Sequence, residues 1–205
     1  MTNPRGMWDQ RYAEEGFAYG EAPNAFFRGE LEKLPAGKLL LPAEGEGRNA
    51  LFAASRGWAV DALDFSDVAR KKALAQAEKL GLSLHYEVAD LADYSPGSAA
   101  PYDAIGLIFV HLPPPLRKSF HRKLIDALKP GGRVILCAYH TRQLGRGTGG
   151  PGQAELLYTA DLLREDFRGM EMELLEERVA DLDEGRYHRG TSEIVAMVCR
   201  KAGEA

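Results

Sequence analysis

The chain has 205 residues, a formal net charge of −4 and an apolar content of 45%. A chain of this length can bury one substantial core, and its acidic balance lacks the basic surface that nucleic-acid binding requires. We therefore expect a single domain over residues 1–205 that acts on a small molecule and has no nucleic-acid partner. The pattern carries no signal for an oligomeric state.

The two cysteines and the N-terminal residues indicate in which cellular compartment the protein is expected. Cys137 and Cys199 each lie in an apolar run, which is typical of buried strand residues in a reducing compartment rather than of a disulfide. The N-terminal residues have no apolar segment of a secretion signal, and no window approaches the roughly 20 apolar residues of a membrane span. We expect a cytoplasmic protein without a membrane partner.

Seven apolar runs of strand length follow one another along the chain. Helical patterns separate most of the earlier runs, and this alternation predicts a doubly wound, mostly parallel α/β sheet of seven strands. Only residues 183–191 separate the segment that holds the sixth run and ends at Leu182 from the segment that holds the seventh and begins at Ser192. They are too few for a crossover helix, so these runs must form an antiparallel C-terminal hairpin. The runs cover residues 38–43, 59–65, 84–90, 104–110, 133–139, 172–179 and 193–200.

Two segments fall outside this alternation. Residues 1–30 are rich in aromatic side chains, and we expect them to form a cap over the sheet. Residues 141–158 are rich in Gly and Pro, and a loop of this length inside a compact domain is often a lid or a binding loop. A flexible connector is the alternative for this loop.

The first apolar run leads into a glycine turn and then into the start of a helix. Gly45 and Gly47 allow a ligand to approach the backbone, and the helix that follows offers free N–H groups. The spacing Gly45-x-Gly47-x-x-Ala50 also fits a dinucleotide-binding turn. A nicotinamide-dependent oxidoreductase is therefore one alternative function.

Two carboxylates in the turn favour a different ligand. Glu44 and Glu46 would repel a pyrophosphate, whereas they would attract a ligand with ammonium and sulfonium centres, such as S-adenosylmethionine. The alternative, that these carboxylates only point into water, is stronger for Glu46 than for Glu44.

The ends of the second and third strands add further cofactor-binding candidates. Asp64 follows the glycine turn at the spacing of a carboxylate that accepts hydrogen bonds from both ribose hydroxyls. Its alternative role is to cap the next helix, although Ser66 can do so. Asp90 is placed to accept from an adenine amino group and Leu91 to present a backbone N–H, with a turn-capping role as the alternative for Asp90.

Several segments together carry a resemblance to a known family. Five segments and the terminal hairpin resemble class I S-adenosylmethionine-dependent methyltransferases over nearly the whole chain. The segments are PAEGEGRNA, ALDFS, VADL, HLP and LKPGGRVIL. Three further segments are similar to the small tellurite-resistance and thiopurine methyltransferase branch: WDQRYAEEGFAYGEAPN, GRN and TGGP…YHRG. The resemblance implies a Rossmann-like fold, S-adenosylmethionine as cofactor and a small acceptor such as a thiol or an oxyanion. A non-catalytic S-adenosylmethionine-binding protein is the second alternative.

The glycine turn departs from the family's pattern. Leu41 stands where the family usually has an acidic residue, and Ala43 stands at the position of its first glycine. We therefore expect Glu44 to supply the carboxylate for the methionine ammonium group. Ala43 and Gly45 are cofactor-binding candidates beside it.

Phe65, next to Asp64, and Phe109, after the fourth strand, complete the cofactor-binding candidates at the strand ends. In the resembled branch the N-terminal segment lies over the methionine end of the cofactor, where it would exclude water. The resemblance therefore implies cofactor contacts for Trp8 and Tyr19. The alternative is that these aromatic residues only complete the core.

Candidates for catalysis follow the strands whose carboxyl ends share one edge of the sheet. The sixth strand runs parallel to the first five, so the hairpin after it should reach this edge. We expect His188 to act as a general base and Arg189 to hold an anionic acceptor, with a water-exposed hairpin tip as the alternative. His111 is the third catalytic candidate, and fixing a turn is its alternative role.

Overall fold

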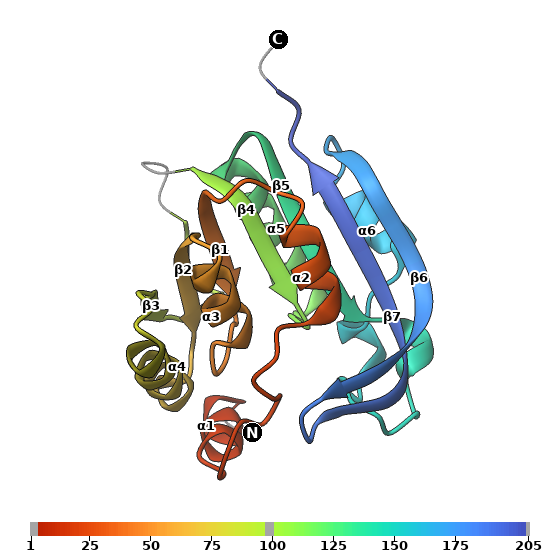
Figure 1. Ribbon diagram of the computed structural model, residues 1–205. Coiled ribbons are helices and arrows are strands. Elements are labelled where there is room, and N and C mark those ends of the chain that lie inside the picture. Colours follow the sequence, from red (N-terminus) through yellow and green to blue (C-terminus); the bar gives the residue numbers. More distant parts are fainter. Residues whose placement is uncertain (1–3, 97–100, 204–205) are drawn as a thin grey trace.

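The computed structural model describes residues 4–96 and 101–203. These residues form one seven-stranded sheet of order β3-β2-β1-β4-β5-β7-β6 (Figure 1). Neighbouring strands from β3 to β5 pair in parallel, whereas β7 runs antiparallel to both β5 and β6. The strands are β1 Lys38–Pro42, β2 Ala59–Asp64, β3 His85–Val88, β4 Tyr102–Ile108, β5 Leu128–Tyr139, β6 Glu171–Glu184 and β7 His188–Arg200. The predicted mixed α/β sheet with an antiparallel C-terminal hairpin is confirmed.

Strand β1 occupies the centre of the sheet, between β2 and β4. Leu39, Leu40 and Leu41 are all buried, as a central parallel strand covered on both faces requires. The strand order reverses between β1 and β4, and ligands of open α/β sheets bind at the carboxyl ends of the strands at such a point. This topology places the glycine turn after β1 at the expected ligand site.

Helices cover both faces of the sheet (Figure 1). One core contains Phe27 of α2 and Ala50 of α3, and the other contains Phe120 of α5 and Phe167 just after α6. The helices are α1 Pro4–Tyr12, α2 Ala25–Leu31, α3 Arg48–Ser55, α4 Asp67–Leu80, α5 Pro114–Ala127 and α6 Ala160–Asp166, with 3-10 turns η1 Thr141–Gln143 and η2 Ala154–Leu156. No helix within residues 4–96 and 101–203 has both the length and the apolar character needed to cross a bilayer.

The C-terminal hairpin is longer than its apolar pattern indicates. Strands β6 and β7 continue as a ladder to the pair Glu184 and His188, so the turn itself is short. An apolar run marks only the buried part of a strand, whereas backbone hydrogen bonds extend the ladder through polar residues. His188 is consequently a strand residue, and its orientation is fixed by the ladder.

The loop after β5 is anchored to β7. The Gln143 side chain donates from Nε2 to Thr148 Oγ1 at 2.8 Å and accepts at Oε1 from the backbone N–H of Glu193 at 2.8 Å. Thr148 Oγ1 also lies 3.0 Å from Ser192 Oγ. These contacts fix the loop against the hairpin that carries His188.

Candidate active site

Left-handed backbone marks the carboxyl ends of the two strands at the reversal point. Ala43 after β1 has φ 51° and Phe109 after β4 has φ 55°, and they are the two residues other than glycine with positive φ in the described part of the chain. This conformation costs a non-glycine residue roughly 1–2 kcal/mol, and such strain concentrates at functional sites. Both residues were expected in the cofactor site.

Glu44 has a role that was not expected from the sequence. Its Oε1 accepts from the backbone N–H groups of Asn49 at 2.7 Å and Ala50 at 2.8 Å, and its Oε2 accepts from Asn49 Nδ2 at 3.2 Å. Three of the roughly four acceptor positions of a carboxylate are therefore used. Glu44 caps the N-terminus of α3, so its carboxylate and the N–H groups that the sequence left for a ligand are partly satisfied within the chain. Its contact with the methionine ammonium group stays a prediction.

Glu46 is also buried rather than exposed to water. It accepts from the backbone N–H of Ala18 at 2.7 Å and from Lys72 Nζ at 2.9 Å. The carboxylate thus joins the N-terminal segment to α4. Burial raises the pKa of the other carboxylate of the turn, Glu44, to about 7, against the opposing effect of its hydrogen bonds from Ala50 and Asn49.

Asp64 ends β2 beside the glycine turn, as expected, and its side chain is buried. Oδ2 accepts from the backbone N–H of Gly45 at 3.1 Å, and Oδ1 accepts from that of Ser66 at 2.9 Å. Burial raises the pKa of Asp64 to about 6. Capping of α4 falls to Ser66, whose Oγ accepts from Ala69 N, so the helix-capping alternative for Asp64 is excluded.

The third strand is followed by a turn that Asp90 stabilises. Its Oδ1 accepts from the backbone N–H of Ala92 at 2.9 Å, which is the turn-capping role named as the alternative. The side chain is exposed and its second oxygen makes no hydrogen bond with the described chain, while Leu91 beside it is buried. Asp90 therefore caps the turn and keeps one oxygen for a ligand.

The N-terminal segment lies over the glycine turn. Trp8 and Tyr12 stack with ring centroids 5.5 Å apart, and Tyr19 lies 6.1 Å from Trp8. A side-chain carbon at Gly45 would lie only 2.8 Å from Tyr12 Oη, so Tyr12 packs directly on the turn. Tyr12 was not among the expected site residues, although its spacing of four from Trp8 places both rings on one face of a helix.

Three rings pack against the ring of His188. Together the four form what we call the four-ring cluster: Tyr19, Phe109, Tyr139 and His188. The His188 ring lies 4.5 Å from Tyr19, 4.3 Å from Phe109 and 5.3 Å from Tyr139, between centroids. Tyr139 Oη and His188 Nδ1 are buried and have no hydrogen-bond partner in the described chain. Buried polar atoms are nearly always satisfied, so two unsatisfied ones on neighbouring rings indicate a binding site. Tyr139 was not among the expected site residues.

The surroundings of His188 favour a neutral imidazole. Burial lowers its pKa, and the nearby Glu184 carboxylate, with Oε2 3.8 Å from Nδ1, opposes this only in part. Burial acts to raise the pKa of Glu184, but His188 and Arg48 outweigh it and hold that pKa below its usual value. A neutral histidine beside an ionised carboxylate is suited to accept a proton.

His111 does not fit its predicted catalytic role. Its Nδ1 lies 2.7 Å from the carbonyl oxygen of Leu156, to which it donates, and its Nε2 accepts from the backbone N–H of Tyr139 at 3.3 Å. Burial lowers the pKa of His111 to about 4. Both ring nitrogens are occupied in holding the chain, so the turn-fixing alternative is the one that the structure supports.

The side chain of Arg189 does not lie beside that of His188. Successive side chains of a strand point to opposite faces, so Arg189 leaves the four-ring cluster and its side chain is 76% exposed. It lines a separate cleft of about 490 Å³, next to the loop that contains Gly149. The expectation that the two residues form one group is therefore corrected.

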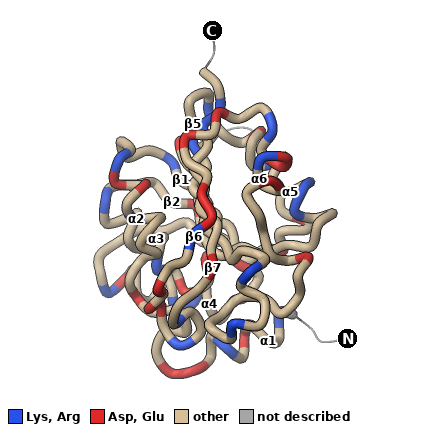
Figure 2. The backbone as a smooth tube through the Cα atoms, turned by 90° about the vertical axis from the view of Figure 1, so that its right-hand side faces the viewer, with Lys and Arg blue, Asp and Glu red and all other residues tan. Residues whose placement is uncertain are grey.

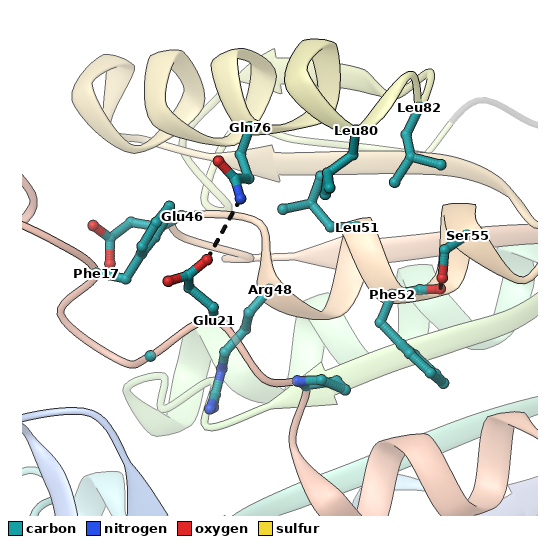
Figure 3. A pocket seen from close by; sticks show the side chains of 12 residues that line it. Phe17, Glu21, Glu46, Arg48, Leu51, Phe52, Ser55, Gln76, Leu80 and Leu82 are labelled. Carbon is teal, nitrogen blue, oxygen red and sulfur yellow. Dashed lines mark hydrogen bonds between the residues drawn. The ribbon is translucent and has the colours of Figure 1, made fainter.

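A second hollow, of about 420 Å³, lies on the outer side of the glycine turn (Figure 3). Apolar side chains of Leu51, Phe52 and Leu80 line it, and Glu21 accepts a hydrogen bond from Gln76 across it. The lining contains none of the expected cofactor-binding or catalytic residues. We therefore separate this hollow from the candidate active site.

Comparisons with known proteins bear on the domain and the fold. Residues 42–132 match the family model described as a methyltransferase domain. No curated protein matches the sequence significantly.

Solved structures share the fold at low sequence identity. TehB from Haemophilus influenzae is 18% identical, with a TM-score of 0.73 over 96% of this chain and 66% of that one. NodS, an N-methyltransferase from Bradyrhizobium japonicum WM9 solved with S-adenosyl-l-homocysteine, is 12% identical, with a TM-score of 0.70 over 98% and 99%. A protein of echinomycin biosynthesis, solved in work on the conversion of a disulfide bond into a thioacetal group, is 20% identical, with a TM-score of 0.77 over 99% and 93%.

The matched residues include the glycine turn, Asp64, Phe109 and the start of β5, whereas Tyr19, Tyr139 and His188 of the four-ring cluster lie outside the match. The domain match and the fold together identify the chain as a methyltransferase that uses S-adenosylmethionine.

Proposed function

We propose that the chain methylates a small acceptor, a thiol or an oxyanion, in the four-ring cluster, with His188 as the general base. The observation that carries this proposal is the pair of unsatisfied buried atoms, Tyr139 Oη and His188 Nδ1, next to the strained backbone of Phe109. The resemblance of the N-terminal, GRN and TGGP…YHRG segments to the tellurite-resistance and thiopurine branch supports the choice of acceptor.

The residues at the strand ends fit the cofactor. Asp64 has acceptor positions left for ribose hydroxyls, and Asp90 has one free oxygen for the adenine amino group. Phe65 and Leu91 adjoin these carboxylates in the chain, so we assign them to the adenosine end. Ala43 and Gly45 form the glycine turn, and Trp8 and Tyr19 cover the methionine end.

S-adenosylmethionine supplies a methyl group that is activated by the sulfonium centre. His188 would accept the proton of an acceptor thiol, and the thiolate that results would then take the methyl group that the bound cofactor supplies. Glu184 would stabilise the imidazolium that results, because its negative charge lies 3.8 Å from Nδ1 and Arg48, at 2.7 Å, helps to keep it ionised. Phe109 and Tyr19 exclude water from the transfer.

The decisive experiment measures S-adenosylhomocysteine release with a panel of thiol and oxyanion acceptors. We expect turnover by the natural chain and a roughly hundredfold lower kcat for His188→Ala, as the loss of a general base typically causes, with unchanged cofactor affinity. His85→Ala is the matched control, because His85 is exposed at the start of β3 and contacts only Asp61. No turnover with any acceptor despite cofactor binding would support the non-catalytic alternative.

A further inference from the structure

The cleft that Arg189 lines lies between a glycine-rich loop and the tip of the β6–β7 hairpin. The loop, residues 145–152, contributes most of one wall. Gln143, Arg186, Tyr187 and Arg189 form the rest of the lining. The cleft has a volume of about 490 Å³, which is enough for a small organic molecule.

The charge of the cleft differs from that of the chain. The chain has a net charge of −4, and Figure 2 shows acidic and basic residues interspersed over the backbone, yet the lining contains two arginines and no carboxylate. Arg186 is held by Glu14, with Nη1 3.0 Å from Oε2. Arg189 has only Asp183 near it, at 3.7 Å, which is beyond hydrogen-bond distance. The guanidinium group of Arg189 is therefore available to an anion.

Only the backbone of a glycine separates this cleft from the four-ring cluster. A side-chain carbon at Gly149 would lie 2.3 Å from Tyr139 Oη and 2.7 Å from the carbonyl oxygen of Tyr187. Gly149 lines the cleft, and Tyr139 Oη on its other side is the unsatisfied buried hydroxyl. The cleft thus lies on one side of Gly149, which has no side chain, and the unsatisfied hydroxyl of Tyr139 lies on the other.

The loop is rich in glycine at this point. Gly145, Gly147, Gly149 and Gly150 all have positive φ, a conformation that glycine adopts at little cost. Thr148 is fixed to the hairpin through Ser192 and Gln143, and Gln143 Nε2 also donates to the carbonyl oxygen of Gly149 at 3.1 Å. Breaking this one hydrogen bond to Gly149 would connect the cleft to Tyr139 while the anchor at Thr148 holds.

We propose that this cleft binds an anionic group of the methyl acceptor, with Arg189 as its partner, and that the acceptor's nucleophile reaches Tyr139 and His188 past Gly149. The inference rests on the proposed function and narrows its substrate class to small thiols that also carry a carboxylate. Arginine suits this role because its planar fork matches both oxygens of a carboxylate.

The test uses protein labelled with ¹⁵N-glycine and saturated with S-adenosylhomocysteine, titrated with 3-mercaptopropionate or with 2-mercaptoethanol. Both probes have the same thiol, and only the first has a carboxylate. We expect 3-mercaptopropionate to shift the amide signals of Gly149 and Gly150 at concentrations at which 2-mercaptoethanol does not. Arg189→Gln should weaken this binding roughly tenfold, the effect of losing one charge-assisted hydrogen bond.

Arg164→Gln on α6 is the matched control, because Arg164 is an exposed arginine paired only with Asp161. Equal responses to the two thiols, no response to either, or equal weakening by both variants would overturn the inference. If S-adenosylhomocysteine itself fails to bind, the proposed function fails instead, so the two failures are distinguishable.

Discussion

The hydroxyl of Tyr139 and Nδ1 of His188 sit on rings 5.3 Å apart, and neither atom has a hydrogen-bond partner in the described chain. An unsatisfied buried polar group costs about 1–3 kcal/mol, so this arrangement destabilises the protein without ligand. A pair of such atoms beside Phe109 is explained if a ligand satisfies them. Stability and activity should therefore respond in opposite directions when either atom is removed.

Tyr139→Phe should raise the free energy of unfolding by about 1 kcal/mol, because it deletes an unsatisfied hydroxyl and keeps the ring. The same variant should lower kcat/KM about tenfold, through the loss of one hydrogen bond to the acceptor. Urea titration and steady-state kinetics check the two effects. Tyr158→Phe is the control, because Tyr158 Oη accepts from Leu112 N at 3.2 Å and its removal should cost stability. A Tyr139→Phe protein with unchanged kcat/KM would remove this hydroxyl from the acceptor site.

The pH profile of kcat/KM should report the lowered pKa of His188. A base must be unprotonated, so the acid limb should lie below the ordinary histidine value of about 6.5. Glu184→Gln removes the charge that raises this pKa, so the acid limb should move to still lower pH. Stopped assays between pH 4.5 and 8 measure both profiles. An acid limb that Glu184→Gln leaves in place, or moves upward, would contradict the assignment of His188 as the base.

Local sequence signals predicted the elements that depend on local chemistry. Ser66 caps α4 as expected, because an N-cap hydroxyl acts within a few residues of the chain. The antiparallel hairpin followed from loop length alone. Asp64 reached the expected place because the end of β2 is fixed by the parallel register of β1 and β2.

The contacts of individual side chains could not be predicted in the same way. Glu44 has acidic character suited to an ammonium group, yet its hydrogen bonds go to Asn49 and Ala50, a choice set by the geometry of the turn. Tyr139 reads as one more apolar residue of a core strand, and only the packing of three distant segments leaves its hydroxyl unsatisfied. His188 and Arg189 are adjacent in sequence and separated in space because a strand alternates its side chains.

Asp64→Asn should weaken S-adenosylmethionine binding by about 1.5–3 kcal/mol, the range for hydrogen bonds that involve a charged group. The amide keeps the size of the side chain while it loses one of the two acceptor oxygens. Asp103→Asn is the matched control, because Asp103 bonds Lys38 N at 2.7 Å and Lys129 Nζ at 2.8 Å at the other edge of the sheet. Calorimetric titration measures both affinities. An equal affinity for Asp64→Asn and the natural chain would exclude Asp64 from the ribose site.

Glu44 makes stability depend on pH in a direction that tests its burial in the glycine turn. Burial raises its pKa from 4.5 to about 7, so the folded state binds this proton more tightly than the unfolded state does. The stability that this proton contributes is present below pH 4.5 and is lost as the pH rises through about 7. Relative to Glu44→Gln, which does not titrate, the natural chain should lose up to about 3 kcal/mol between pH 4.5 and 7.5, from roughly 1.4 kcal/mol per pKa unit.

Urea titrations of both proteins across this range measure the difference, without cofactor. Asp64, whose pKa is raised to about 6, titrates in both proteins, so its contribution cancels. A difference that stays constant with pH would mean that folding does not raise the pKa of Glu44, and it would contradict the burial of this carboxylate in the glycine turn.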